Sequence, residues 1–281
     1  VRNNKFKWTG VLPGNTSETL WTEYYKTHEL PQVLNPESGY IYNANHSPFK
    51  STSIDENPNP QDFAPNMGFE TFDNNRSTRI FELIESHKSI DYKVFKKIKY
   101  DNKFPTPFNY NFMDVNNIME MKPTEYPDVA DLIEQIQNWD RSTDVNSTGA
   151  GAYAMFYYTL ADKYFYKSYY DRNFSKSLIA DCLVEVKKRM KKYFNSTTIK
   201  LGDFQKLVRG DKEMPIFGMP DVITAMNAST YKDGKVQVTH GESYIQLVKF
   251  SSKGTEIESI ISYGSSDNEE SPHYNDQMEL Y

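Results

Sequence analysis

Two asparagines close the stretch at residues 39–45, which reads GYIYNAN. The residues before them favour a β-strand, whereas asparagine is depleted in strands and common in turns. If the segment is a strand, alternation places the side chains of Asn43 and Asn45 on the same face. A side-chain amide offers an N–H donor that does not titrate at any working pH.

The other side chains with catalytic or metal-binding potential show no recognisable pattern. The sequence contains no P-loop, no GxGxxG, no HExxH and no GxSxG motif. Its histidines are scattered without ligand spacing, and each is expected to be structural or exposed: His28, His46, His87, His240 and His273. The single cysteine, Cys182, excludes an internal disulfide and lies on the apolar side of a predicted helix, which indicates a small core residue.

Composition limits the class of protein. The chain has 281 residues and a formal net charge of −6, which argues against nucleic acid or an anionic membrane as its main partner. No run of about 18 apolar residues is present, so no membrane span is expected. The first ten residues, VRNNKFKWTG, lack the apolar region of a signal peptide. The length is sufficient to bury a sizeable core.

The chain changes character near Asn75. Residues 1–75 are rich in Pro, Gly, Asn, Ser and Thr, with strand-like pieces at 6–11 and 39–45 and a long ordered loop at 51–66. Beyond them, apolar residues recur at helical spacing. This pattern predicts helices at 75–90, with Asn75 as the cap, and at 127–139, 152–165 and 175–194. The basic end of the last helix suits the helix dipole and favours a solvated face over a nucleic-acid patch.

The period changes again beyond Gly210. Three strand-like pieces occur at 235–240, 243–250 and 256–263, and SSKGT between the last two is a hairpin signal. The layout is therefore strands, helices and strands. That order predicts an α+β layered domain whose sheet is built from both ends of the chain.

Three separated segments resemble the penicillin acylase and acyl-homoserine-lactone acylase family of N-terminal nucleophile hydrolases. The first runs from GVLPG through LPQVLNPESGYIYNANHSPF, the second is FQKLVRGDKEMPIFGMPDVITA, and the third is the tail from GESYIQLVKF to NDQMELY. They cover nearly the whole chain in the family's order. Within the family, LPQV.NP.SG and NANHSP resemble the acyl-homoserine-lactone acylase branch most closely.

The resemblance implies a fold and an activity. The fold would be an αββα sandwich, incomplete here, with residues 1–75 and 236–281 in the sheets and the helical segment 76–195 covering one side. The whole of 1–281 would be one domain, with 196–281 supplying a loop and the C-terminal strands. Family members hydrolyse N-acyl amides with an N-terminal serine whose own α-amino group is the base.

The resemblance also implies two site residues. The family's oxyanion donor, the amide of an asparagine ending this strand, corresponds to Asn45, with Asn43 as a neighbour. The family's active-site arginine, at the start of the next helix, corresponds to Arg76, and Arg79 is its competitor. The alternatives are that Asn45 is only a turn residue and that Arg76 is only a surface residue of the first helical turn.

One departure from the family is large. The chain begins with Val1 rather than serine, and Gly264-Ser265 belongs to the tail motif. The nucleophile, its neighbouring histidine and a backbone oxyanion donor are therefore expected on a missing segment, carried by a companion chain, and residues 1–281 alone are expected to be inactive. No cofactor is expected. Calcium is possible in the complete enzyme, although none of Asp55, Glu56 and Asp62 is assigned to it.

Two interpretations remain. The first is the C-terminal portion of a periplasmic or secreted amide hydrolase acting on an acyl-homoserine lactone or a related N-acyl amide. The second is a stand-alone, non-catalytic remnant of the family that binds an acyl ligand or a protein.

Overall fold

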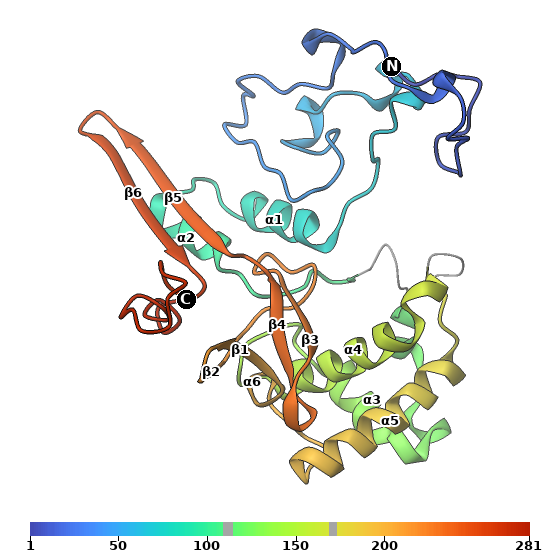
Figure 1. Ribbon diagram of the computed structural model, residues 1–281, viewed down its shortest axis with the longest axis vertical. Helices are drawn as coiled ribbons and strands as arrows, with labels where there is room; N and C mark the ends of the chain where they lie inside the picture. The colour runs from blue at the N-terminus through green and yellow to red at the C-terminus, as the bar shows by residue number, and fades with distance from the viewer. Residues whose placement is uncertain (109–114, 169–172) are drawn as a thin grey trace. The chain divides into compact units, whose positions relative to one another are not determined.

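The polar, turn-rich first quarter of the chain folds without regular elements. The computed structural model describes residues 1–108, 115–168 and 173–281, and it divides into two compact units, Val1–Ser77 and Thr78–Tyr281 (Figure 1). Up to residue 74 the first unit contains only short 3-10 turns, namely Ser17–Thr19, Thr27–Glu29, Ile54–Glu56, Pro60–Asp62 and Pro65–Met67. The expectation of a single domain over 1–281 stays a prediction.

The strands predicted at 6–11 and 39–45 are wrong, because the structure assigns no strand within residues 1–75. A strand requires a ladder of successive backbone hydrogen bonds to a neighbour. Tyr42 N donates to Ser51 O at 2.9 Å, but no ladder among the described residues follows from this bond. The prediction that one sheet is built from both chain ends is wrong for the same reason.

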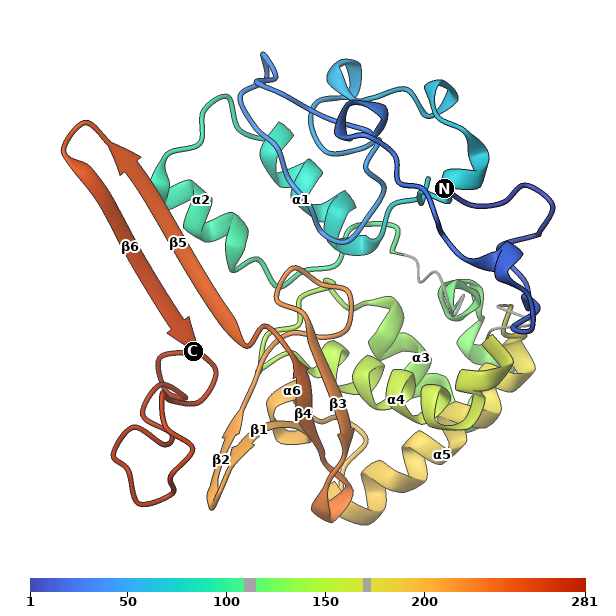
Figure 2. The ribbon, with the colours of Figure 1, turned by 45° about the horizontal axis from the view of Figure 1, so that its top comes forward.

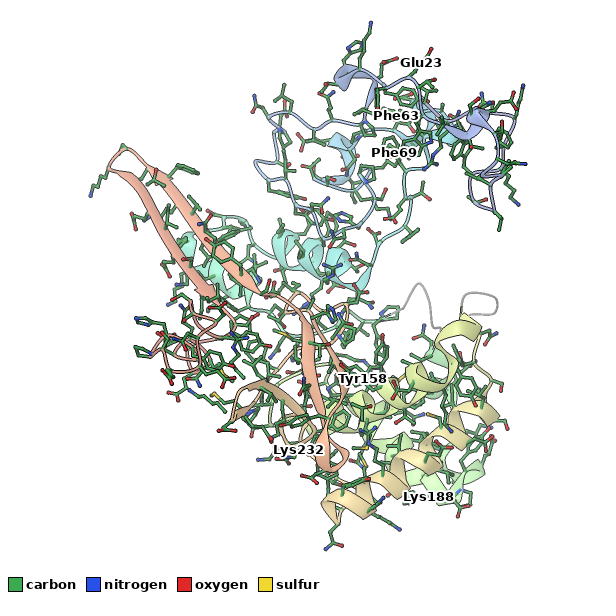
Figure 3. The ribbon with its side chains drawn as sticks, viewed as in Figure 1. Glu23, Phe63, Phe69, Tyr158, Lys188 and Lys232 are labelled. Atoms are coloured by element: carbon green, nitrogen blue, oxygen red, sulfur yellow. The ribbon has the colours of Figure 1, made fainter. Side chains whose placement is uncertain are left out.

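Aromatic contacts hold the first unit together. Phe49, Phe63 and Phe69 form a cluster with ring centroids 5.5 to 6.4 Å apart (Figure 3). The Arg2 guanidinium lies 5.8 Å from the ring centroids of both Trp8 and Trp21. Several large apolar side chains nevertheless stay exposed, including Val11, Leu20, Trp21, Tyr24, Leu34, Ile41 and Ile54. The unit therefore has little core of its own.

The helices follow the predicted order, with two additions. They are α1 (Asn75–Glu85), α2 (Tyr92–Lys99), α3 (Ala130–Gln137), α4 (Thr148–Ser168), α5 (Lys176–Phe194) and α6 (Leu201–Phe204). The helices predicted at 75–90, 127–139, 152–165 and 175–194 are found as α1, α3, α4 and α5, although α1 already ends at Glu85 and α3 spans only Ala130–Gln137. The short α2 and α6 were not predicted. The cap of α1 is Asn74 rather than Asn75, because Asn74 Oδ1 accepts from Ser77 N at 2.8 Å.

The core of the second unit lies around α4, with α3 and α5 beside it (Figure 2). Tyr153, Phe156 and Leu160 of α4 are fully buried, as its apolar faces predict. The predicted apolar stripe of α5 is also buried, including Cys182. Burial raises the pKa of the Cys182 thiol to about 12, so this cysteine is a core residue, as predicted. In the described part of the chain no helix is both long and apolar enough to cross a membrane.

A four-stranded mixed sheet packs against these helices. It contains β1 (Gln205–Arg209), β2 (Lys212–Pro215), β3 (Met226–Thr230) and β4 (Val236–Gly241) in the order β2-β1-β4-β3, with β1 and β4 parallel. Tyr158 of α4 lies against this sheet, its hydroxyl 3.5 Å from both Gln205 Oε1 and Met226 O (Figure 3). The chain is thus α+β, as predicted, and β4 confirms the strand at 235–240.

The last two strands form a hairpin, β5 (Tyr244–Ser251) with β6 (Gly254–Ile261), as SSKGT predicts. One face buries Ile245 and Leu247 and carries Lys249, Glu256 and Glu258. Glu258 on that face accepts from Tyr92 Oη at 2.9 Å and pairs with Lys96, both of α2. The register places only uncharged residues on the opposite face, namely Tyr244, Gln246, Val248, Phe250, Thr255, Ile257, Ser259 and Ile261.

Candidate functional site

Asn45 lies in a tight turn and not at the end of a strand. Its φ is +56°, in the left-handed region that asparagine tolerates better than most residues. Asn43 Oδ1 accepts from Asn45 N at 2.9 Å, which is the local bond of an Asx turn. The predicted placement of the two side chains on one strand face is therefore wrong, because Asn43 supports the backbone of Asn45 instead.

Arg76 contacts Asn45 directly. Its Nη1 donates to Asn45 Oδ1 at 3.0 Å, across 31 positions of sequence. Because a guanidinium only donates, this bond determines which end of the amide is oxygen. Among the described residues Asn45 Nδ2 makes no hydrogen bond, and the residue is exposed. The turn therefore carries an N–H₂ group with a defined orientation on an exposed residue.

His46 ties the turn together from inside. Its Nδ1 accepts from Ala44 N at 3.1 Å, and its Nε2 lies 2.6 Å from Lys50 O. These partners require the neutral tautomer with the proton on Nε2, because Nδ1 must accept and Nε2 must donate. The ring is 5 % exposed and stacks on Tyr42 with centroids 4.9 Å apart. Both ring nitrogens are therefore used in structure, as the sequence predicts for its histidines.

Two charged side chains near the turn, Lys50 and Asp73, are paired with each other. Asp73 lies one residue before the cap of α1. Burial and the nearby Asp73 carboxylate raise the pKa of Tyr42 to about 12. Tyr42 is thus neutral at working pH, and the turn offers hydrogen-bond donation rather than proton transfer.

Arg79, the competitor of Arg76, is held by other groups. Its Nε and Nη2 donate to the two carboxylate oxygens of Asp101 at 2.9 and 2.8 Å, and its Nη1 lies 3.3 Å from Glu82. The paired Asp101 carboxylate raises the pKa of Arg79. A bidentate pair of this kind fixes the guanidinium plane. Of the two arginines, Arg76 is the one in contact with Asn45.

The carboxylates considered for calcium do not form a ligand set. Glu56 accepts from Ser53 Oγ at 2.6 Å, from Ser38 N at 3.1 Å and from the Glu37 amide. These bonds lower its pKa from 4.5 to about 2, with the Ser38 side chain as the largest cause. Across the described ranges, no group of three or more His, Cys, Asp or Glu side chains could hold a metal ion.

The basic end of α5 is only partly a solvated face. Lys188, Lys191 and Lys192 are exposed, and Figure 3 shows Lys188 on the outer side of the helix. Lys187 instead pairs with Asp131 at 2.8 Å, and Arg189 Nε donates to Gly234 O at 3.1 Å. Lys187 thus joins α5 to α3, and Arg189 joins α5 to the turn before β4.

Sequence reasoning did not identify Asn74 as a residue of the site, and it gave no specific partners for His46. For Asn74 a signal existed, because asparagine directly before a run of residues with helical spacing is a preferred N-cap. For His46 no signal existed, since its partners Ala44 N and Lys50 O are backbone groups.

Comparison with known proteins identifies the family of this chain. The profile of the family described as penicillin amidase matches residues 1–281. An acyl-homoserine lactone acylase PvdQ of Pseudomonas syringae pv. syringae (strain B728a) is 36% identical over 85 residues, which is 29% of this chain and 11% of that protein. The namesake from Pseudomonas fluorescens (strain Pf0-1) is 32% identical over 83 residues, 28% of this chain and again 11% of the relative. Because the family profile matches the whole chain, the protein belongs to the penicillin amidase family.

Proposed function

We propose that residues 1–281 are the C-terminal portion of an amide hydrolase in which Asn45 Nδ2 donates to the oxyanion of the tetrahedral intermediate. The observation that carries the proposal is the 3.0 Å bond from Arg76 to Asn45 Oδ1, which leaves the Nδ2 of an exposed residue available to donate. The substrate would be an N-acyl amide, and an acyl-homoserine lactone is the first choice because relatives carry that name.

The chemistry follows from the geometry of an acyl transfer. An N-terminal serine, carried on a segment outside these 281 residues, would attack the amide carbonyl with its α-amino group as base. The carbonyl oxygen becomes an oxyanion, which Asn45 Nδ2 and a backbone N–H of the other segment would stabilise. An amide held in advance by Arg76 donates without the cost of reorientation in the transition state.

The complete molecule would be an αββα sandwich, periplasmic or secreted, in which a companion segment covers this chain. The β5–β6 hairpin supports this proposal, because its outer face carries eight uncharged residues. Phe250 on that face is 80 % exposed and Ile257 is 60 % exposed. Such a face is typical of a sheet that packs against a further layer.

The test is the turnover of the full-length, self-processed protein carrying Asn45→Ala. We expect kcat to fall by about 10²–10³, the usual loss for one oxyanion donor, while KM changes little. Asn45→Asp is expected to be at least as damaging, because a carboxylate repels the developing charge. Asn43→Ala is expected to be milder, since Asn43 acts on the Asn45 backbone.

The matched control is Asn59→Ala, which removes an exposed amide elsewhere in the same unit. A near wild-type Asn45→Ala with a crippled Asn43→Ala would assign the donor to Asn43. If neither change affects kcat, the oxyanion role is wrong. A full-length protein that shows no turnover at all would instead favour the non-catalytic, ligand-binding remnant.

A further inference from the structure

Asn74 connects the turn of Asn45 to the helix that carries Arg76. Its Nδ2 donates to Ala44 O at 2.7 Å and to Asn45 O at 3.3 Å. Its Oδ1 accepts from Ser77 N at 2.8 Å, and its backbone N donates to Ser77 Oγ at 3.0 Å. One amide group therefore bonds to the backbone of the turn at one end and caps α1 at the other.

The orientation of this amide is determined by its partners. The two carbonyl oxygens can only accept, and the Ser77 N–H can only donate, so Nδ2 must face the turn and Oδ1 must face the helix. Reversing the amide would place its oxygen against the two carbonyl oxygens of the turn and its N–H₂ group against the Ser77 N–H. The bridge thus has one arrangement, and Asn is the residue type that supplies donor and acceptor on one short side chain.

The bridge spans the two partners of the site. Arg76 lies between Asn74 and Ser77, in the first turn of α1, so the cap sets the position from which its side chain leaves the helix. At the other end, the bonded carbonyls belong to Asn45 and its buried neighbour Ala44. The Arg76–Asn45 bond at 3.0 Å closes a ring of contacts through Asn74.

We propose that Asn74 is a positioning residue that holds the Asn45 amide and the Arg76 guanidinium in register; the catalytic consequence rests on the proposed function above. The side-chain bonds described above run from Asn74 to backbone groups of the turn and of α1, so the proposed effect on catalysis acts through geometry. A misplacement of about 1 Å in a catalytic group can cost about 10²-fold in rate.

The bonds at the two ends of the Asn74 amide can be separated by substitution. Asn74→Asp and Asn74→Ser both keep an oxygen that accepts from Ser77 N, and both are good capping residues. Neither can donate as Asn74 Nδ2 does, because a carboxylate has no N–H and the serine side chain is shorter. Asn74→Ala removes the side-chain bonds to the turn as well as the bond that caps α1. Asn59→Asp is the matched control. Asn59 also caps a turn, by accepting from Gln61 N, and the substitution adds the same negative charge as Asn74→Asp.

The experiment measures kcat and KM of these variants in the full-length, self-processed protein. We expect Asn74→Asp and Asn74→Ser to lower kcat by about 10²-fold, as Asn74→Ala does, with KM little changed. Asn59→Asp should match the wild type. If Asn74 only caps the helix, Asn74→Asp and Asn74→Ser will turn over like the wild type and Asn74→Ala alone will be impaired, which would overturn the proposal.

A second measurement does not depend on activity. The side-chain amide resonances of Asn45 and the amide hydrogen exchange of Ser77 are recorded by NMR on residues 1–281. In Asn74→Asp we expect the Asn45 resonances to shift while the Ser77 amide stays protected. Unchanged Asn45 resonances would refute the positioning role. Shifted resonances together with a fully active Asn45→Ala enzyme would refute the oxyanion role and leave the positioning role intact.

Discussion

At the scale of residues, the site depends on how an amide is oriented rather than on a shifted pKa. Asn45 does not titrate, and the neighbouring Tyr42 is kept neutral by a pKa of about 12. The orientation comes from a single donor, Arg76 Nη1, on Asn45 Oδ1. A left-handed turn with φ of +56° brings this amide to the surface.

Removing the Arg76 side chain should allow the Asn45 amide to rotate. We expect Arg76→Ala to lower kcat by about tenfold, since a hydrogen bond to a charged donor contributes about 1.5–3 kcal/mol and part of it is replaced by water. Arg76→Lys should lose less, because an ammonium still donates, although not with the fork geometry of a guanidinium. Steady-state kinetics of the full-length protein check this order. A kcat equal to that of the wild type in both Arg76→Ala and Arg76→Lys would contradict the role of Arg76.

Glu56 gives the first unit a pH dependence. Its folded pKa of about 2 lies below the ordinary value of 4.5, so its bonds stabilise the loop above pH 4.5 and are lost as pH falls from 4.5 toward 2. We expect the amides of Glu37 and Ser38 to lose hydrogen-exchange protection in that range. Glu56→Gln should show weak protection at every pH. The exposed Glu70→Gln is the control and should behave like the wild type.

At the scale of elements, α4 is positioned by a close backbone approach. A Cβ placed on Gly151 would lie 2.1 Å from Ile199 O, a contact that the backbone cannot relieve by a rotamer change. The segment before α6 therefore passes directly over this point of α4. Glycine is needed here for space, although it is a poor helix former.

Gly151→Ala is expected to destabilise the second unit. Alanine would gain about 1 kcal/mol in helix propensity, but overpacking against Ile199 costs about 1–3 kcal/mol or more. The free energy of unfolding, measured with urea, should fall. Asp181→Ala, at an exposed position of α5, is the control and should be neutral or stabilising. A more stable Gly151→Ala protein would show that the backbones do not approach this closely.

At the scale of the whole molecule, the chain exposes apolar surface that a finished protein usually covers. The outer hairpin face and some aromatic side chains of the first unit are exposed, as Phe250 at 80 % and Tyr24 at 84 % illustrate. Among the described residues β5 and β6 pair only with each other, so each leaves an outer edge unpaired, which adds an aggregation risk. We therefore expect residues 1–281 to associate with themselves or with a companion segment.

The hairpin offers a direct test of that association. Phe250→Lys combined with Ile257→Lys should reduce the oligomeric mass measured by light scattering and the binding of a hydrophobic dye. Ser252→Lys adds charge in the turn of the same hairpin and should change neither. A wild-type chain that stays monomeric at high concentration without dye binding would contradict the expectation.

The sequence alone predicted the features that depend on local periodicity or on family motifs. The apolar stripes of α3 and α5, the buried character of α4, the β5–β6 hairpin and the resemblance to the penicillin acylases were all readable. A helix satisfies its own backbone and shows which face it buries, so its pattern is contained in a short window. The short strands β1, β2 and β3 lack such a window and were missed.

Only the tertiary structure decided the geometry of the candidate site. Residues 39–45 have strand-favouring composition, but no described segment forms a ladder with them. The chain therefore turns there, and the backbone of Asn45 adopts the left-handed conformation. The sequence suggested Asn45 and Arg76 as separate residues, and their 3.0 Å contact and the Asn74 bridge depend on segments about 30 positions apart. Contacts of that range are set by how the chain folds back on itself, because no local propensity specifies which distant group a side chain will meet.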